Sequence, residues 1–416
     1  MEITVHPSYL KGKAEAPASK SLTQRAIAAG LLAHGTTVIH DPSFCNDSLA
    51  AIRIAEALGA VVATGSKGIT IESGPLTASP VTLHCGESGL ALRMFSPVAA
   101  LLSDHVSLTG EGSLVKRPVK MIGDALSQLG VTVTTTNGLL PVTLNGRLRG
   151  GRAVIDGSTG SQLLTGLLMS LPLAGSDSEI EVNNLKSSPY ISLTLELLSD
   201  FGVTVENKGF SHFIIPGNQS YNSCEYTVEG DWSGAAFLLV AGALAGEVSV
   251  RNLSSRSLQA DRAIMQALSD AGCHLTETAE EVTTEKSDLK AFCFDATDSP
   301  DLFPPLAALA AGCRGTSRIK GVSRLVHKES DRAGAIAIVL SAMSIISRVE
   351  GDEMLIDGGE VRGAVVSSHN DHRIAMMAAV MATSATGGVT IKDAEAVAKS
   401  YPGFFDDLSL LGASIS

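Results

Sequence analysis

Aromatic side chains are scarce in this chain: Phe, Tyr and Trp make up 4% of its 416 residues, with one Trp and five Tyr. Proteins that bind single-stranded nucleic acid stack the bases on aromatic side chains, so this class of function is not expected. Net positive charge is also lacking, because the formal charge is −12. That charge argues against general binding to nucleic acid or to a membrane surface. Any anion that binds must meet cations that are concentrated locally.

Cysteine patterns typical of metal sites or disulfides are absent from the sequence. The six Cys residues are widely scattered, and none belongs to a CxxC motif or to a Cys/His ligand spacing. They are Cys45, Cys85, Cys224, Cys273, Cys293 and Cys313. We therefore expect buried, reduced thiols and no metal site.

Long apolar runs are lacking as well. Residues 1–13 contain no apolar core of the signal-peptide type. Uncharged stretches such as Leu163–Gly175 are too short or too polar to span a bilayer. A cytoplasmic location is expected. Because 44% of the residues are hydrophobic and 18% are charged, a chain of this length can fill two or three domains with sizeable cores.

A repeat with a long period is present. Four similar segments each end an amphipathic run and precede a short extended stretch: Glu56–Ala60, Ser127–Val131, Ser199–Val203 and Ser269–Cys273. Each predicts a helix that ends at a Gly in the left-handed conformation, followed by a strand. The four glycines are 71, 72 and 70 residues apart. The same step continues to Ser341–Ile345, where Ser344 replaces the Gly, and to Leu410–Ser414.

Six α/β units of about 70 residues account for the whole chain by this spacing. Helix caps that recur by coincidence are the alternative explanation. The turn-forming stretch Pro216–Ser220 lies between the third and fourth units. Two lobes of three units each are therefore predicted, and ligands often bind between such lobes.

Arginines stand near the expected starts of four helices: Arg25, Arg93, Arg332 and Arg373. A helix N-terminus is the positive end of the helix dipole and disfavours cations. Its free N–H groups bind anions, however, and an added Arg supplies a fixed fork for phosphate or carboxylate. The set therefore indicates an anion site, with Ser19 or Ser21 capping the first of these helices. The alternative is that each Arg pairs with a local acid. Candidate acids are Glu87, Glu329 and Asp371.

Two further basic segments are weaker signals. Lys116-Arg117 precedes a Pro in the polar loop Glu111–Pro118, and adjacent cations of this kind usually form a solvated face. Lys399, near the C-terminus, is weaker still. The sequence has neither a GxxxxGK[ST] phosphate loop nor a complete GxGxxG after a strand, so nucleotide binding has no support.

In their order and spacing, these segments resemble the 5-enolpyruvylshikimate-3-phosphate synthases. The resemblance extends along essentially the whole chain and rests on PASKSLTQRA, GESGLALR, EGSLVKRP, DGSTGSQLLTGLL, SSPYISLTLELL, EGDWSGAAF, HKESDR, NDHRIAM and AKSYPGFF. It implies an α/β fold of two lobes, each of three repeated βαβαββ units, as in the inside-out α/β barrels of enolpyruvyl transferases. It also implies that the first strand belongs with the C-terminal lobe. Lobe 1 then comprises residues 1–17 and 230–416, on the phosphoenolpyruvate side, and lobe 2 residues 18–229, on the shikimate 3-phosphate side.

The resemblance implies transfer of the enolpyruvyl group of phosphoenolpyruvate to the 5-hydroxyl of shikimate 3-phosphate, with release of phosphate. The reaction belongs to the shikimate pathway, which leads to chorismate and the aromatic amino acids. Protonation at the methylene carbon and attack at C2 give a tetrahedral intermediate, which then loses a proton and phosphate. No metal or organic cofactor is implied, and a monomer is expected. Two crowded anions must be held together, which requires several fixed cations.

Carried over by position, the resemblance implies two sets of contacts. Shikimate 3-phosphate is expected to contact Ser21, Arg25, Gly160, Ser161, Gln162, Ser187 and Tyr190. Gly160 stands where the family often has Ser, so only its backbone can contribute. Phosphoenolpyruvate is expected to contact Gly89, Arg93, Arg117, Arg332, Arg373 and Lys399. Lys20 is expected to contact both substrates, and Asp301 and Lys328 complete the set.

Two acidic residues match the family's proton-transfer groups. Asp301 matches the base near the 5-hydroxyl, and Glu329 matches the acid/base at the methylene carbon. Proton transfer to carbon needs a carboxyl group that can be protonated near neutral pH, whereas nearby lysines lower the pKa of such a group. Lys20 and Glu329 therefore both remain candidates for the proton donor.

The helix after Gly89 departs from the family pattern at two positions. Leu90 stands where the better-known bacterial and plant enzymes have Thr, and Met94 stands where they have Pro. Neither position carries reacting chemistry, so catalysis is expected to survive. We expect weaker inhibition by glyphosate, the family inhibitor that competes with phosphoenolpyruvate, because a bulky Leu90 shifts the backbone of Gly89.

Two other functions stay open at this point. UDP-N-acetylglucosamine enolpyruvyl transferases share the fold, the donor and the mechanism, but they usually carry a reactive Cys in the loop that is Glu111–Pro118 here, and this loop has none. They also have Lys-Asn where this chain has Lys20-Ser21. A non-catalytic anion-binding protein on the same scaffold would keep the arginines and lose the acid/base residues, which are all present.

Overall fold

The computed structural model describes residues 1–65, 68–73, 80–326 and 328–416. The chain forms two compact units: unit 1 comprises Met1–Pro17 and Glu229–Ser416, and unit 2 comprises Ala18–Val228. His327, the first residue of the HKESDR motif, lies outside the described residues. The chain passes between the units at residues 17–18 and 228–229, and not at the turn-rich stretch Pro216–Ser220.

Unit 2 contains six α-helices and fourteen strands among the described residues. The helices are α1 (Lys20–Leu32), α2 (Asn46–Ala57), α3 (Gly89–Leu102), α4 (Lys120–Leu126), α5 (Gln162–Ser170) and α6 (Pro189–Asp200). The strands are β3 (Ala33–His34), β4 (Thr36–His40), β5 (Val61–Gly65), β6 (Gly68–Glu72), β7 (Val81–His84), β8 (His105–Thr109), β9 (Thr132–Thr136), β10 (Leu139–Asn145), β11 (Arg152–Asp156), β12 (Ser178–Asn183), β13 (Glu206–Lys208), β14 (His212–Ile215), β15 (Tyr221–Asn222) and β16 (Glu225–Thr227). Short 3-10 helices are η1 (Gly112–Lys116), η2 (Ser127–Leu129) and η3 (Leu171–Leu173).

Unit 1 has the corresponding elements. Its helices are α7 (Trp232–Ala245), α8 (Ile264–Asp270), α9 (Phe303–Ala311), α10 (Arg332–Ala342), α11 (His372–Thr383) and α12 (Phe404–Leu410). Its strands are β1 (Glu2–His6), β2 (Leu10–Glu15), β17 (Gly246–Arg251), β18 (His274–Glu277), β19 (Glu281–Glu285), β20 (Cys293–Asp295), β21 (Thr316–Lys320), β22 (Ile346–Glu350), β23 (Glu353–Asp357), β24 (Val365–Ser367), β25 (Val389–Lys392) and β26 (Ser414–Ile415). Short 3-10 helices are η4 (Ala260–Ala263), η5 (Pro300–Leu302), η6 (Val322–Leu325) and η7 (Ala394–Lys399).

Six four-stranded sheets share one topology. In unit 2 their strand orders are β16-β4-β6-β5, β7-β8-β10-β9 and β11-β12-β14-β13. In unit 1 the orders are β2-β17-β19-β18, β20-β21-β23-β22 and β24-β25-β1-β26. The first two strands of each order run parallel, and the other neighbours are antiparallel. The α/β fold with three βαβαββ repeats in each lobe, expected from the sequence, is confirmed.

Strands distant in sequence complete three of these sheets. β2 pairs in parallel with β17, so Leu10 lies opposite Gly246. β1 lies between β25 and β26, with Glu2 opposite Lys392 and Val5 opposite Ile415. β16, which follows the turn-rich stretch, pairs in parallel with β4, so Glu225 lies opposite Val38. These pairings explain why the chain changes units after β16, and not at the turn-rich stretch.

The repeated helix end has the conformation that the sequence predicts. Gly59, Gly130, Gly202, Gly272 and Gly412 have φ values of 106°, 88°, 78°, 80° and 104°. Ser344, which replaces Gly in the fifth unit, has a φ of 68°. Positive φ is readily adopted by Gly and only rarely by other residues. The local geometry of the repeat is thus kept even where the glycine is lost.

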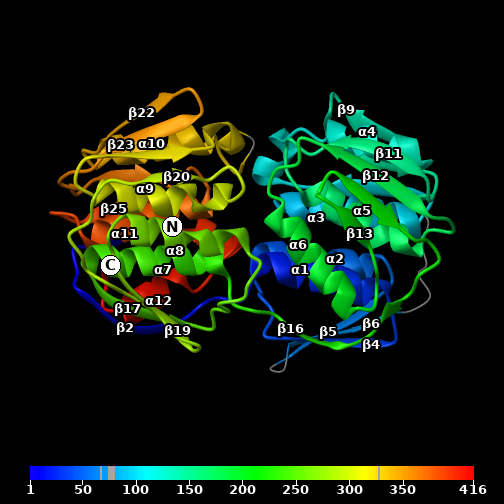
Figure 1. Cartoon of the computed structure of the whole chain (residues 1–416), viewed down its shortest axis with the longest axis horizontal. Coiled ribbons are helices and arrows are strands. Elements are labelled where there is room, and N and C mark those ends of the chain that lie inside the picture. Colours follow the sequence, from blue (N-terminus) through cyan, green and yellow to red (C-terminus); the bar gives the residue numbers. More distant parts are fainter. Residues whose placement is uncertain (66–67, 74–79, 327) are drawn as a thin grey trace. The chain divides into compact units, whose positions relative to one another are not determined.

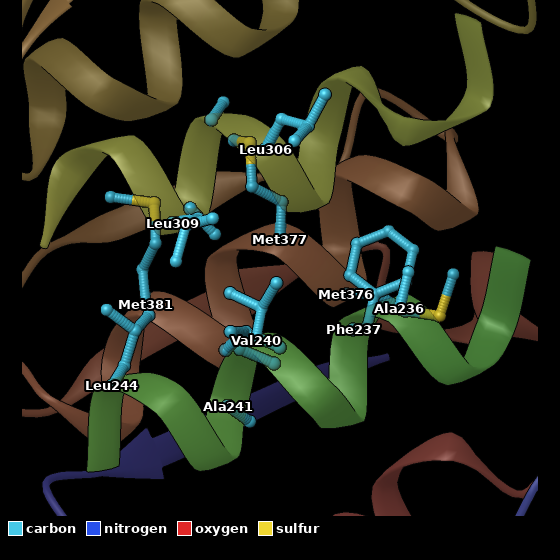
Figure 2. Packing of buried hydrophobic residues seen from close by; sticks show 14 of the residues in the cluster. Ala236, Phe237, Val240, Ala241, Leu244, Leu306, Leu309, Met376, Met377 and Met381 are labelled. Carbon is cyan, nitrogen blue, oxygen red and sulfur yellow. The ribbon is translucent and has the colours of Figure 1, made fainter. Parts of the chain in front are cut away.

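Buried helices form the core of each unit. In unit 1, α7, α9 and α11 pack against one another, with strands around them (Figure 1). Every residue of α7 is buried, which explains a helix that is apolar on all faces. Figure 2 shows Val240 of α7 near Met377 of α11, and Leu244 of α7 near Met381 of α11. In unit 2, α3 packs closely on α5, where a Cβ at Gly166 would lie 2.4 Å from the Met94 carbonyl oxygen.

Two further features considered from the sequence are the cysteines and membrane-spanning segments. All six cysteines are free, and four of them are buried, but Cys293 is exposed and Cys224 is partly exposed. The expectation of uniformly buried thiols is therefore wrong for these two, because they lie in or near short strands with one face in solvent. No helix in the described part of the chain is long and apolar enough to cross a membrane.

Candidate active site

In unit 1, three segments bring charged side chains into one cluster. Asp301 lies on η5, Glu329 lies in the loop just before α10, Arg332 is the first residue of α10, and Arg373 lies at the start of α11. Lys328 joins them from the residue before Glu329. We call these five residues the unit 1 cluster. Its members come from segments as much as 72 residues apart, so the fold, and not local sequence, brings them together.

Asp301 accepts from three cations. Its Oδ1 lies 3.2 Å from Lys328 Nζ and 2.9 Å from Arg332 Nη1, and its Oδ2 lies 3.1 Å from Arg373 Nη2. Burial by itself raises the pKa of this carboxyl, but the nearby Arg373, Lys328 and Arg332 together hold that pKa well below its ordinary value. Asp301 is therefore ionised at neutral pH. Burial lowers the pKa of Lys328, and Asp301 only partly offsets this effect.

Arg332 is fully buried and contacts three carboxylates. Its guanidinium donates to Asp301 and Glu329, and Nε donates to Asp371 Oδ2 at 2.9 Å. Burial alone lowers the pKa of this Arg, but Asp371, Glu329 and Asp301 together raise it above its ordinary value. For Arg332 the alternative expected from the sequence, pairing with local acids, describes the structure.

Asp371 holds two helix starts together and was not among the expected site residues. Fully buried, it is the N-cap of α11, and its Oδ1 accepts from the backbone N–H of Arg373 at 3.0 Å. Its Oδ2 also accepts from the Ser330 hydroxyl at 3.1 Å, beside Arg332 Nε. The sequence signal was its place directly before His372-Arg373, where a capping Asp is common. From the sequence, Asp371 was expected only as an alternative partner of an Arg at a helix start.

Neutral groups contribute to the anchoring of Arg373 and Lys399. Arg373 Nη1 donates to the hydroxyl of Ser233, the second residue of α7, and to the Asp301 carbonyl at 3.4 Å. Burial opposes its charge, but Asp301 raises the pKa of Arg373 above its ordinary value. Lys399 ends η7, is 7% exposed, and donates to the Asn370 carbonyl at 2.7 Å. Nothing in the sequence around Ser233 pointed to its contact with Arg373, since the two are 140 residues apart.

In unit 2, the first turn of α1 places Lys20 and Ser21. Ser19 is the N-cap, since its Oγ accepts from Leu22 N at 3.4 Å. Lys20 Nζ lies 3.1 Å from Asp47 Oδ2, and both side chains are largely buried. Asp47 is a further residue that the sequence did not single out; it belongs to the first turn of α2.

Arg25 is buried among neutral groups. Its Nε donates to Thr194 Oγ1 at 3.0 Å, Nη1 donates to the Ser21 carbonyl at 2.9 Å, and Nη2 donates to Thr165 Oγ1 at 3.4 Å. Its guanidinium carbon lies 5.9 Å from the centre of the Tyr190 ring. No carboxylate of the described chain pairs with it. Burial lowers its pKa from 12.5 to about 10, so it remains a cation at neutral pH.

A second group in unit 2 surrounds the start of α3. Arg93 Nη1 donates to Gln162 Oε1 at 2.8 Å. A Cβ added at Gly89 would lie 2.8 Å from Arg93 Nη1 and 2.9 Å from Arg117 Nη1, so the two arginines crowd this glycine. Arg117 is 6% exposed, whereas its neighbour Lys116 is exposed. Of this pair, only Lys116 therefore has a solvated side chain.

The remaining expected residues lie at element starts in unit 2. Gly160 has a φ of 135°, Ser161 is the N-cap residue of α5, and Gln162 is its first residue. Ser187 is buried with a φ of 59°, and Tyr190 is the second residue of α6. Arg25 and Arg93 lie in the second turns of α1 and α3, and only Arg332 and Arg373 lie in first turns. Arg25 and Arg93 therefore lie one turn further from the helix start than Arg332 and Arg373, because Ser19 and Ser88 cap α1 and α3.

Metal chemistry has no visible support in the described residues, where no three His, Cys, Asp or Glu side chains are grouped to hold an ion. The groups that the structure assembles are cations with a few carboxylates and hydroxyls. They fit an α/β enzyme that binds small anions and moves protons.

Comparison with known proteins identifies the family. Residues 5–408 match the family described as EPSP synthase (3-phosphoshikimate 1-carboxyvinyltransferase), and the chain belongs to that family. A Clostridium kluyveri protein named 3-phosphoshikimate 1-carboxyvinyltransferase is 37% identical, over 99% of this chain and 98% of its own length. A protein of the same name from Methanocorpusculum labreanum is 39% identical, over 100% of this chain and 99% of its own length. The EPSP synthase structure from Acinetobacter baumannii has a TM-score of 0.83 at 26% identity and covers 100% of this chain and 99% of its own.

Proposed function

We propose that this chain transfers the enolpyruvyl group of phosphoenolpyruvate to the 5-hydroxyl of shikimate 3-phosphate, giving 5-enolpyruvylshikimate 3-phosphate and inorganic phosphate. The full-length match to the family carries this proposal. The side chains support it, because the reaction needs buried cations for two anions and carboxyl groups for proton transfer. Asp301, Glu329 and the arginines of both units supply these groups.

We assign the substrate contacts as follows. In unit 2, Arg25 binds shikimate 3-phosphate together with Ser21, Gly160, Ser161, Gln162, Ser187 and Tyr190. The residues assigned to phosphoenolpyruvate are Gly89, Arg93, Arg117, Arg332, Arg373 and Lys399. Lys20 contacts both substrates. Arg25 fits a phosphate group particularly well, because it is a buried cation that hydroxyl, carbonyl and aromatic groups orient without neutralising.

Asp301 acts as the base toward the 5-hydroxyl. In the substrate-free protein its pKa is held low by Arg373, Lys328 and Arg332, despite burial. Substrate anions on those cations offset part of the positive field, so the basicity of Asp301 rises when it is needed. Proton loss from the 5-hydroxyl then accompanies its attack on C2 of the enolpyruvyl group.

Glu329 and Lys20 are the two candidates for the proton donor to the methylene carbon. Glu329 pairs with Arg332, whereas Lys20 pairs with Asp47. After addition, collapse of the tetrahedral intermediate expels phosphate, whose charge Arg and Lys side chains stabilise. Glu329→Gln and Lys20→Met variants distinguish the two donors when the reaction is run in deuterated solvent. The variant that no longer incorporates deuterium at the methylene carbon identifies the donor.

A phosphate-release assay with separate acceptors tests the proposed function. Shikimate 3-phosphate is expected to support release of phosphate from phosphoenolpyruvate, and UDP-N-acetylglucosamine is expected to support none. Release with the second acceptor alone would favour the related transferase. Binding of both substrates without turnover would instead favour a non-catalytic anion-binding protein. We further propose that the protein is a cytoplasmic monomer, and sedimentation analysis checks the oligomeric state.

We also propose weak inhibition by glyphosate. Leu90 is buried directly after Gly89, and Met94 is buried one turn further along α3. Replacement of Leu90 by the smaller Thr is expected to lower the inhibition constant while leaving turnover largely intact. A wild-type inhibition constant as low as that of typical sensitive enzymes would contradict this proposal.

A further inference from the structure

Two loops of unit 2 meet in front of α3. The first contains Glu87, and the second leads into η1 (Gly112–Lys116). The Glu87 carboxylate Oε2 accepts from the backbone N–H of Ser113 at 2.8 Å. The backbones are also joined, because Glu111 N donates to the Gly86 carbonyl at 2.9 Å. Glu87 therefore binds the first turn of the 3-10 helix that precedes Arg117.

Close packing leaves little room for other arrangements of these loops. Gly112 has a φ of 56°, and a Cβ added there would lie 2.2 Å from the Glu87 carboxylate. At Gly110, a Cβ would lie 2.9 Å from the Gly86 carbonyl oxygen. Gly112 needs the absence of a side chain on both grounds, conformation and space. The position of the Glu87 side chain therefore depends on the backbone at Gly112, which it contacts.

The same 3-10 helix holds Arg117. Ser113, whose N–H donates to Glu87, uses its Oγ to accept from Arg117 Nη2 at 3.2 Å. The other terminal nitrogen of Arg117, Nη1, lies against Gly89. A connected path therefore runs from Glu87 through Ser113 to the guanidinium of Arg117, and Glu87 stands only two residues before Gly89.

We propose that Glu87 is a positioning residue, which holds the 3-10 helix so that Arg117 points at the phosphoenolpyruvate site. The proposal rests on the assignment of Arg117 to phosphoenolpyruvate made above. This role also explains why the carboxylate of Glu87 stands in a region that must bind an anion. Because Glu87 acts through Arg117, its loss affects phosphoenolpyruvate and not shikimate 3-phosphate.

Steady-state kinetics on four proteins test this role: wild type, Glu87→Ala, Glu87→Gln and the matched control Lys116→Ala. Lys116 lies in the same 3-10 helix, but its side chain is exposed. Loss of a charge-assisted hydrogen bond is expected to raise the KM for phosphoenolpyruvate about tenfold in Glu87→Ala. The KM for shikimate 3-phosphate stays within about twofold, and Glu87→Gln, which keeps an acceptor oxygen, recovers most of the loss.

Hydrogen exchange on the same proteins gives a readout that does not depend on turnover. The amide of Ser113 is expected to exchange faster in Glu87→Ala and at the wild-type rate in Lys116→Ala. Unchanged exchange in Glu87→Ala would overturn the proposal, as would equal rises in both KM values. A wild type without phosphate release would contradict the proposed function instead, and the exchange result would still decide the anchoring role of Glu87.

Discussion

Arg25 in unit 2 and Arg332 in unit 1 are both buried, yet their surroundings differ in charge. Arg25 contacts hydroxyl, carbonyl and aromatic groups, and burial lowers its pKa to about 10. Arg332 contacts Asp301, Glu329 and Asp371, which raise its pKa despite burial. One cation is left uncompensated in the interior, and the other is balanced by carboxylates.

The difference indicates two uses of a buried cation. An uncompensated charge is costly to bury, so the folded protein retains it at the expense of stability until an anion binds. A compensated charge contributes little to anion binding by itself, but it fixes the carboxylates around it. We therefore propose that Arg25 binds an anion, while Arg332 also holds Asp301 and Glu329 in position.

Replacement of Arg332 by Met is expected to have the largest effect. It leaves Asp371 buried without its cation, and breaking a buried pair in this way costs about 3–5 kcal/mol of the free energy of unfolding. Urea denaturation followed by circular dichroism measures the loss. A stability equal to that of wild type would show that the carboxylates do not depend on Arg332.

Replacement of Asp301 by Asn removes the proposed base. We expect kcat to fall by about 10²–10⁴-fold, the usual contribution of a positioned acid or base. Phosphate release under saturating substrates measures it. If kcat falls less than tenfold while KM for phosphoenolpyruvate rises, Asp301 serves only to orient the cations of the unit 1 cluster.

Replacement of Arg25 by Met acts on binding. The KM for shikimate 3-phosphate is expected to rise roughly 10- to 100-fold, because a charged hydrogen-bond donor to a phosphate is lost. The KM for phosphoenolpyruvate changes little. Equal changes in both KM values would mean that Arg25 supports unit 2 as a whole and is not specific to one substrate.

The dependence of stability on pH is expected to give the smallest effect. Because the pKa of Asp301 in the folded protein lies below its ordinary value near 4, its pairing stabilises the protein above about pH 4 and is lost as the pH falls further. The difference in unfolding free energy between wild type and Asp301→Asn should therefore shrink between about pH 5 and pH 3. A constant or growing difference over that range would contradict the low pKa.

The sequence predicted the repeat better than it predicted the contacts of the site. Glycines at a period of about 70 residues predicted six helix ends, since positive φ is a local requirement that one residue can reveal. Ser344 shows that the same conformation persists without Gly. The partners of the arginines could not be read in this way. Arg25 meets Thr194 and Arg373 meets Ser233 across 169 and 140 residues, so only the fold joins them.

The sequence also did not show which carboxylates balance the charges of the arginines. The sequence placed Arg332 and Arg373 at helix starts, but a helix start does not show which carboxylate faces it. The convergence of both on Asp301, and the contact of Asp371 with Arg332, depend on how η5, α10 and α11 are brought together by the fold. The assignment of individual residues to each substrate remains a prediction.

One denaturation series on Arg25→Met and Arg332→Met, with and without shikimate 3-phosphate, tests the division between the two cations most directly. Without ligand, Arg25→Met should be at least as stable as wild type and Arg332→Met clearly less stable. Saturating shikimate 3-phosphate should stabilise wild type and Arg332→Met but not Arg25→Met. Equal stabilisation of Arg25→Met and wild type by this ligand would contradict the proposed role of Arg25 and the division itself.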